Sequence, residues 1–230
     1  MTRITLVHAM RHSQKPVEAA FVECWPEAQR TNLLDDSLAT DLSASGAIGG
    51  QMIDRFLRLG RYAASLNSDA ILFTCSAFRL CIEAVRADVA PLTVRGPSDA
   101  MIAEAAVIGG RLALVATFAP TLATMPAEFP SNIQVEPIYV AQALSCLNAG
   151  NVEEHDRLVV EALRGRRFDA VALAQYSLSR AAPAVSAVVN VPVLTAPAAA
   201  VRELRRALQA GARDKSSGNS PCATLSAPLS

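Results

Sequence analysis

Short apolar runs, rich in leucine and β-branched residues, alternate along the chain with longer segments of helical period. The short runs predict eight strands, at 3–8, 29–34, 70–74, 92–95, 111–116, 133–138, 169–174 and 192–195. The clearest helix is predicted at 47–65, where apolar residues recur at helical spacing from Ile48 to Ala63. This alternation is typical of an α/β protein with parallel strands.

The pattern occurs twice. Residues 69–78, Asp-Ala-Ile-Leu-Phe-Thr-Cys-Ser-Ala-Phe, are similar to residues 169–178, Asp-Ala-Val-Ala-Leu-Ala-Gln-Tyr-Ser-Leu, which lie 100 residues further on. Two further pairs of segments match in the same order: 3–8 with 111–116, and 89–94 with 189–194. Each half therefore follows the order β-α-β-α-β-α-β-α, which predicts two similar lobes.

The first α/β lobe is predicted at 1–96 and the second at 97–197, with a helix at 198–210 as a candidate to complete the first lobe. From 211 to 230 the helical period is lost and Ser, Gly and Pro accumulate, which predicts a disordered tail. Ligands of open α/β sheets bind at the carboxyl ends of the strands. If the two lobes face each other, the loops after corresponding strands line one cleft.

The composition favours chemistry on a small molecule. Hydrophobic residues make up 51% of the chain and charged residues 18%, which is typical of a protein with a packed core. Basic and acidic residues are equal at 21 each, so no bulk charge attracts nucleic acid or an anionic membrane. No apolar run approaches the roughly 20 residues of a membrane-spanning helix. The first residues have the pattern of a strand and not of a signal peptide.

Cysteine and histidine usage indicates a cytoplasmic protein without a metal ion. The five cysteines form no CxxC pair, and an odd number without secretory context predicts free thiols in a reducing compartment. The three histidines, His8, His12 and His155, are too scattered along the chain to indicate a metal site.

Cys75 is the strongest catalytic candidate. It stands where a predicted strand gives way to a helix, beside Ser76 and Ala77. Free amides at a helix N-terminus stabilise a thiolate, which predicts a lowered pKa, and the same amides could bind a substrate carboxylate. The alternative is that Cys75 is a small buried apolar residue, as free cysteines often are.

The loop after the matching strand of the second half holds Gln175, Tyr176 and Ser177. Gln175 and Ser177 can form hydrogen bonds with a substrate but have no suitable pKa for abstracting a proton. Their alternative role is to stabilise a turn. Tyr176 is a candidate for a hydrogen bond or for packing.

Three further residues follow strands on the cleft side. Thr117 and Thr121 come after a buried strand, where hydroxyls cap a helix, bind a carboxylate, or do both. His8 ends the first strand, a position that makes it either a structural residue or part of the binding site.

Three segments of the chain resemble the aspartate/glutamate racemase superfamily, which includes hydantoin racemases, maleate isomerases and arylmalonate decarboxylases. They are Ile-Leu-Phe-Thr-Cys-Ser-Ala at 71–77, Leu-Val-Ala-Thr-Phe-Ala-Pro-Thr at 114–121 and Val-Ala-Leu-Ala-Gln-Tyr-Ser at 171–177. With the duplicated layout, the resemblance covers about 1–210. It implies two pseudo-symmetric flavodoxin-like lobes, each with a mostly parallel four-stranded sheet flanked by helices, and an active site in the cleft between them.

The resemblance also implies chemistry without a cofactor, at a carbon next to a carboxylate or carbonyl group. Racemases of this group use one cysteine in each lobe, one to remove the proton and the other to deliver it to the opposite face. Cys75 matches the cysteine of the first lobe, whereas Gln175 stands at the position of the second. Glutamine is neither a base nor an acid, so the sequence favours chemistry with a single thiol. A homodimer is compatible with the resemblance.

The leading hypothesis is therefore a cofactor-independent isomerase or lyase that acts on a small carboxylate or carbonyl compound. Cys75 is expected to serve as acid, base or nucleophile. Residues expected to bind the substrate are His8, Ser76, Ala77, Thr117, Thr121, Gln175, Tyr176 and Ser177. The alternative is a protein that binds a small anion in the same cleft without turning it over. A flavin-binding protein has no support beyond the α/β pattern.

Overall fold

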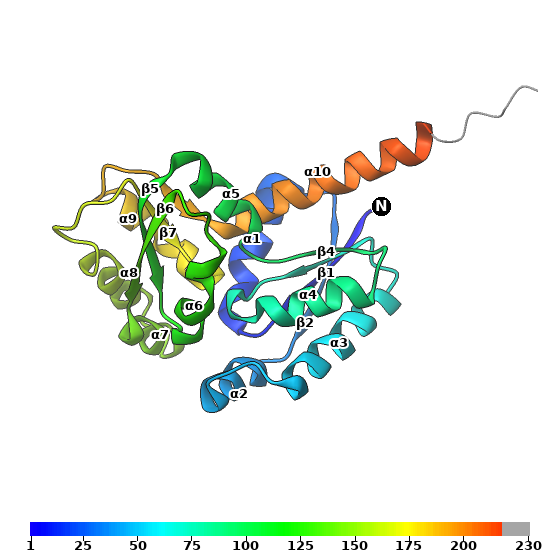
Figure 1. The fold of residues 1–230 in the computed structure, drawn as a ribbon, viewed down its shortest axis with the longest axis horizontal. Helices are drawn as coiled ribbons and strands as arrows, with labels where there is room; N and C mark the ends of the chain where they lie inside the picture. The colour runs from blue at the N-terminus through cyan, green and yellow to red at the C-terminus, as the bar shows by residue number, and fades with distance from the viewer. Residues whose placement is uncertain (218–230) are drawn as a thin grey trace, which may run out of the picture.

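Two four-stranded sheets, both parallel throughout, form the centre of the molecule (Figure 1). The computed structural model describes residues 1–217. Its strands are β1 (Arg3–His8), β2 (Gln29–Leu34), β3 (Ala70–Phe73), β4 (Thr93–Arg95), β5 (Gly110–Ala116), β6 (Ile133–Tyr139), β7 (Ala170–Leu173) and β8 (Val193–Thr195). The first sheet has the order β2-β1-β3-β4 and the second β6-β5-β7-β8. The predicted two-lobed α/β fold is thus confirmed, with every strand within a residue or two of its predicted place.

Helices follow most of the strands. Those of the first half, with 3₁₀ helices written η, are η1 (Arg11–Ser13), α1 (Gln14–Cys24), α2 (Ser37–Ser45), α3 (Gly50–Ser65), η2 (Ser76–Phe78) and α4 (Arg79–Asp88). Those of the second half are α5 (Asp99–Ile108), α6 (Ala119–Thr124), η3 (Met125–Glu128), α7 (Ala141–Asn148), α8 (Val152–Glu161), η4 (Tyr176–Ala181), α9 (Ala182–Ser186) and α10 (Ala196–Ser217).

The helix predicted at 47–65 begins slightly later, at Gly50. Helix α2 ends at Gly46, which has a φ of 71°. That left-handed conformation favours glycine and stops the helix. The chain then turns before α3 starts.

Side chains alternate across the strands and so build a core on each face of each sheet. In β1 and β3, Ile4 and Leu72 face the space between the two sheets, while Val7 and Phe73 face outward. Helices α2, α3 and α4 cover the outer face of the first sheet, and α7, α8 and α9 cover that of the second. Helices α1, α5 and α10 fill the central layer, whose apolar core contains side chains from both sheets.

Helix α10 leaves the second sheet and crosses the molecule to pack along α1 of the first half (Figure 1). It runs to Ser217, so residues 211–217, which we expected in a disordered tail, are helical. The helix continues because Ala, Arg and Lys have high helix propensity, which outweighs the unfavourable propensity of the single glycine at 211. The rest of the predicted tail, 218–230, lies outside the described residues.

The strand order selects the place for a site. In the first sheet the chain runs from β1 to β2 on one side and then returns past β1 to β3 on the other side; the second sheet repeats this with β5, β6 and β7. The strand order therefore reverses between β1 and β3 and between β5 and β7. Ligands of such sheets bind outside the carboxyl ends of the strands at this reversal. The loops found there begin at His8, Thr74, Thr117 and Ala174.

Candidate functional site

Cys75 follows β3 and precedes η2 in extended conformation, with φ −121° and ψ 119°. Its side chain is partly buried and borders the apolar core of the first lobe. Burial raises the pKa of the Cys75 thiol to about 11, although the backbone N–H of Ala77 donates a hydrogen bond to the sulfur and opposes the rise. The lowered pKa expected from a helix N-terminus is therefore wrong. The turn after Cys75 has only three residues, and burial outweighs its amides.

The loop of Cys75 contacts the second lobe through Ser76. The Ser76 and Thr121 hydroxyl oxygens lie 3.4 Å apart, and both residues are buried. Thr121 stands in the short helix α6, so this hydrogen bond joins the two lobes beside the thiol. The structure thus brings together two of the residues that the sequence selected from different halves.

Gln175 and Thr117 form the corresponding part of the second lobe. The Gln175 side-chain oxygen accepts a hydrogen bond of 2.6 Å from the Thr117 backbone N–H and one of 3.1 Å from the Thr117 hydroxyl. Both residues are buried. Because the oxygen is the acceptor, the orientation of the amide is fixed. The two contacts with Thr117 engage the oxygen and not the amide nitrogen, which can only donate.

His8 is completely buried, and both of its ring nitrogens are used inside the first lobe. Nε2 lies 2.8 Å from the Asn32 side-chain oxygen, and Nδ1 lies 2.8 Å from the Thr74 hydroxyl. Asn32 donates from its amide nitrogen to Glu18, so its oxygen must accept from His8 Nε2–H. Burial lowers the pKa of His8, which keeps the ring neutral, with Nδ1 accepting from Thr74. One of the two ring nitrogens of His8 thus contacts Thr74, the residue before Cys75, as the structural role requires, and the substrate contact expected of His8 stays a prediction.

Tyr176 and Ser177 are both buried after β7 but have different surroundings. Tyr176 lies in the central core, where its hydroxyl has no hydrogen-bond partner among the described residues. Burial raises the pKa of this hydroxyl, and the side chain packs in the core, as one of the two predicted roles requires; the substrate contact expected of Tyr176 stays a prediction. Ser177 lines a cavity of about 760 Å³ whose walls do not include Cys75.

Phe118 is a site residue that sequence reasoning missed. It follows Thr117 in the second lobe but packs into the apolar core of the first lobe, the cluster that Cys75 borders. It also lines two neighbouring cavities at the junction of the lobes, of about 330 and 630 Å³. In sequence it is one apolar residue between two threonines, so only the contact between the lobes reveals its position.

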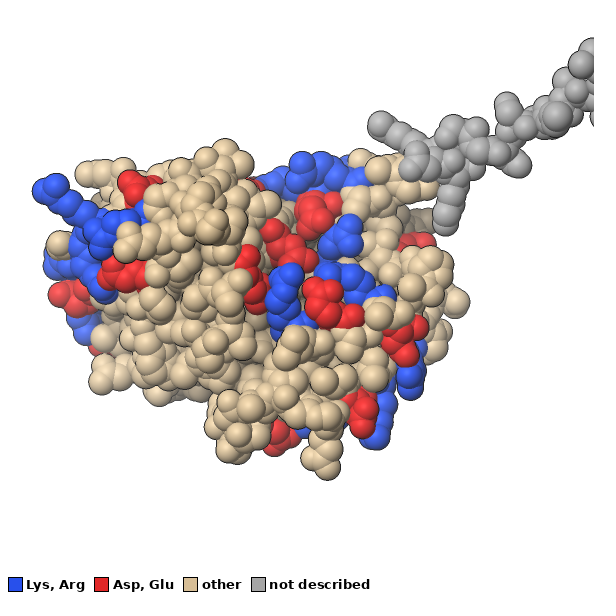
Figure 2. Space-filling view, in the orientation of Figure 1, with Lys and Arg blue, Asp and Glu red and all other residues tan. Residues whose placement is uncertain are grey.

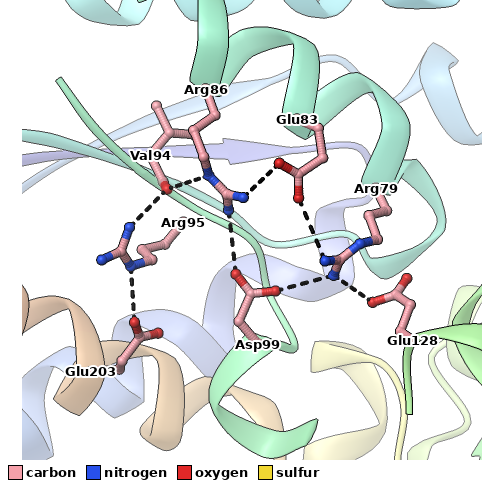
Figure 3. A network of polar contacts seen from close by, with 8 residues as sticks. All are labelled: Arg79, Glu83, Arg86, Val94, Arg95, Asp99, Glu128 and Glu203. Carbon is pink, nitrogen blue, oxygen red and sulfur yellow. Dashed lines mark hydrogen bonds and ion pairs between the residues drawn. The ribbon is translucent and has the colours of Figure 1, made fainter. Parts of the chain in front are cut away.

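A network of charged side chains joins the two lobes (Figure 3). Arg79, the first residue of α4, contacts Glu128 of η3 at 2.9 Å, Asp99 of α5 at 3.4 Å and Glu83 at 3.6 Å. Arg86 extends the network through Glu83 and Asp99. Figure 2 shows these alternating charges gathered at the junction, beside a largely uncharged surface over the lower part of the second lobe.

Residues 1–217 contain neither a candidate metal site nor a candidate membrane-spanning helix. No group of three or more His, Cys, Asp and Glu side chains there is arranged to hold a metal ion. None of the helices in the described part of the chain is long and apolar enough to span a bilayer.

No protein-family model matches the sequence, and no curated protein is similar to it in sequence. Solved structures, however, share its fold. Glutamate racemase from Francisella tularensis, in complex with D-glutamate, has a TM-score of 0.71 at 12% identity, over 92% of this chain and 82% of that one. Aspartate racemase from Picrophilus torridus has a TM-score of 0.69 at 14% identity, over 93% and 95% of the two chains.

A Gly74Cys mutant of arylmalonate decarboxylase, in a sulfate-associated form, has a TM-score of 0.57 at 18% identity, over 91% of this chain and 94% of that one. At sequence identities this low, the similarity shows a common fold and does not show a common activity. The likeness of fold extends over most of this chain and most of each of these three structures. The chain therefore shares its fold with glutamate and aspartate racemases and with arylmalonate decarboxylase.

Proposed function

We propose that the protein is a cofactor-independent enzyme of the aspartate/glutamate racemase superfamily, an isomerase or lyase that acts on a small carboxylate or related carbonyl compound. Cys75 is its acid. The observation that supports this most directly is the state of the thiol: burial holds its pKa near 11. At neutral pH the group is protonated, so it is suited to give a proton and poorly suited to take one.

In the proposed step, the bond between a substrate carboxylate and its neighbouring carbon breaks, CO₂ departs, and the electron pair stays on that carbon, which becomes part of an enolate. The S–H bond of Cys75 breaks, its proton forms the new C–H bond, and the sulfur keeps the electron pair as a thiolate. Solvent then returns a proton to the sulfur. A single thiol supplies this proton from one face only, which fits a chain that has Gln175 at the position of a second cysteine.

Gln175 supports the same proposal as a hydrogen-bond donor. Its oxygen is occupied by Thr117, so the amide nitrogen is the group left for a ligand. An N–H donor stabilises negative charge on a carboxylate or on an enolate oxygen. Thr117 thereby has a positioning role, because it fixes which end of the amide can meet the substrate.

The test is turnover over a panel of amino acids, hydantoins, maleate and arylmalonates, with the Cys75→Ala variant beside the wild type. Loss of a proton donor lowers the rate by about 10²–10⁴-fold. Cys146→Ala, a partly buried cysteine in α7 away from the proposed site, is the matched control and should retain full activity. Unchanged turnover of an accepted substrate by Cys75→Ala would remove Cys75 from the mechanism.

A second candidate is a protein that binds a small anion at the same place without turning it over. Gln175 favours it, since an amide donor binds an anion but transfers no proton at neutral pH. Binding of panel compounds without turnover, weakened by Gln175→Glu but not by Cys75→Ala, would support this candidate over the enzyme.

A further inference from the structure

A cavity of about 760 Å³ is lined by residues of both lobes, and Cys75 is not among them. Neither Thr117 nor Gln175 lines it. Arg11 and His12 of η1 line both this cavity and the 330 Å³ cavity of Phe118, so η1 forms the wall between them. A volume of this size is typical of sites for small organic ligands, which occupy about 300–1,000 Å³.

The cavity is lined by two groups of residues: small or apolar ones, termed the floor, and charged ones, termed the rim. The floor consists of small or apolar residues from both lobes: Pro16, Ala19, Ala20, Leu147, Val152, Pro197 and Ala198. The rim holds three cations, Arg11, Lys15 and Arg180, and one carboxylate, Glu23. Arg11 pairs with an aspartate and so does Arg180, whereas Lys15 makes no ion pair within the described residues.

The polar groups at the cavity also favour an anion. Gln14, the first residue of α1, lines it, and so do Pro197 and Ala198 in the first turn of α10. Helix N-termini carry partial positive charge. Ser177, only 3% exposed, lines it as well. A serine hydroxyl can donate a hydrogen bond to an anion.

We propose that this cavity is a second ligand site, which binds an amphipathic organic anion: a phosphate or carboxylate group at the rim and an apolar body on the floor. The site is independent of the proposed reaction at Cys75. Because its walls come from both lobes, a bound ligand stabilises their present arrangement and raises the melting temperature.

The probe is 1-naphthyl phosphate, measured by isothermal titration calorimetry, with 1-naphthol as the uncharged comparison. Lys15→Glu reverses the rim charge, and Ala19→Phe fills the floor; both residues are exposed on α1. Arg58→Glu is the matched charge reversal on α3, outside the cavity. Cys75→Ala separates this site from the proposed catalytic one.

We expect the wild type to bind 1-naphthyl phosphate with a Kd below about 1 mM and 1-naphthol at least about tenfold more weakly. Lys15→Glu and Ala19→Phe should each weaken binding of the phosphate by about tenfold. Arg58→Glu and Cys75→Ala should bind it within about twofold of the wild type. No binding of the phosphate, equal binding of 1-naphthol, or unchanged affinity in either cavity variant would overturn the proposal.

Discussion

At the scale of single residues, the two matched positions of the repeat have different chemistry. Cys75 is a thiol held in its protonated form by burial, and Gln175 is an amide whose orientation is fixed by Thr117. Sequence identified both positions from the order of strands and loops. It could not give the pKa of Cys75, because the sign of that shift depends on how much protein surrounds the sulfur, and side chains distant in sequence decide that.

The raised pKa predicts slow alkylation of Cys75 at neutral pH. With a pKa of about 11, roughly one thiol in ten thousand is ionised at pH 7, and the thiolate is the reactive form. The rate with iodoacetamide should therefore rise about tenfold per pH unit from pH 7 to 10. Mass spectrometry of the Cys75 peptide measures it. A rate that levels off below pH 8 would show an activated thiolate instead.

Two substitutions of Gln175 separate its roles. Gln175→Ala leaves the buried Thr117 N–H without an acceptor and should lower the free energy of unfolding by about 1–3 kcal/mol. Gln175→Glu keeps an acceptor for Thr117 but removes the N–H donors, so we expect a smaller loss of stability and a higher KM. Urea unfolding and steady-state kinetics measure the two effects. Equal stability of both variants would contradict the assigned hydrogen bonds.

At the scale of elements, the sheets follow directly from the sequence. The central strands β1, β3, β5 and β7 are largely buried and appear as short apolar runs, and the eight strands form where the sequence predicts them. Helix ends were harder to predict. No local pattern indicated that α10 would continue past Gly211, whereas Gly46 stops α2 through its positive φ. Local period predicts an element better than it predicts where the element ends.

Close packing of α3 against α4 predicts contrasting effects at two glycines of one helix. A Cβ added at Gly60 would overlap Cγ1 of Val85, a fully buried side chain with little freedom. Gly60→Ala should therefore lower the free energy of unfolding by about 1–3 kcal/mol. Gly50 has open space around it, and Gly50→Ala should raise stability by about 0.5–1 kcal/mol. Thermal unfolding measures both, and a stabilising Gly60→Ala would contradict the packing.

At the scale of the whole molecule, contacts between the lobes decide what the site contains. Phe118 enters the first lobe from the second, and Arg79 binds Glu128 and Asp99 across the same junction (Figure 3). Neither residue could be assigned from sequence, because no local pattern records a contact between segments dozens of residues apart. The duplicated halves predicted a junction, but not which side chains would fill it.

The network at this junction predicts that substitutions of Glu128 and of Arg79 have unequal effects on stability. Burial raises the pKa of Glu128, so the fold favours its neutral form, and Glu128→Gln should leave stability at pH 7 nearly unchanged. For the same reason, the contribution of Glu128 to stability increases as the pH falls through its raised pKa. Arg79→Met leaves the buried carboxylate without its nearest cation and should cost about 1–2 kcal/mol.

The double variant with both substitutions should recover most of that loss, since it removes the uncompensated charge. Urea unfolding at pH 7 measures all three variants. If the loss of unfolding free energy in the double variant equals the sum of the losses in the two single variants, the two side chains are not coupled across the junction.

The central claim is that Cys75 delivers a proton to one face of the substrate. Turnover of an accepted substrate in D₂O, with the configuration and deuterium content of the product determined by chiral chromatography and mass spectrometry, tests it most directly. The account predicts one deuterium at the reacting carbon, a single product enantiomer, and loss of both in Cys75→Ala. A racemic deuterated product, or deuteration that persists in Cys75→Ala, would contradict it.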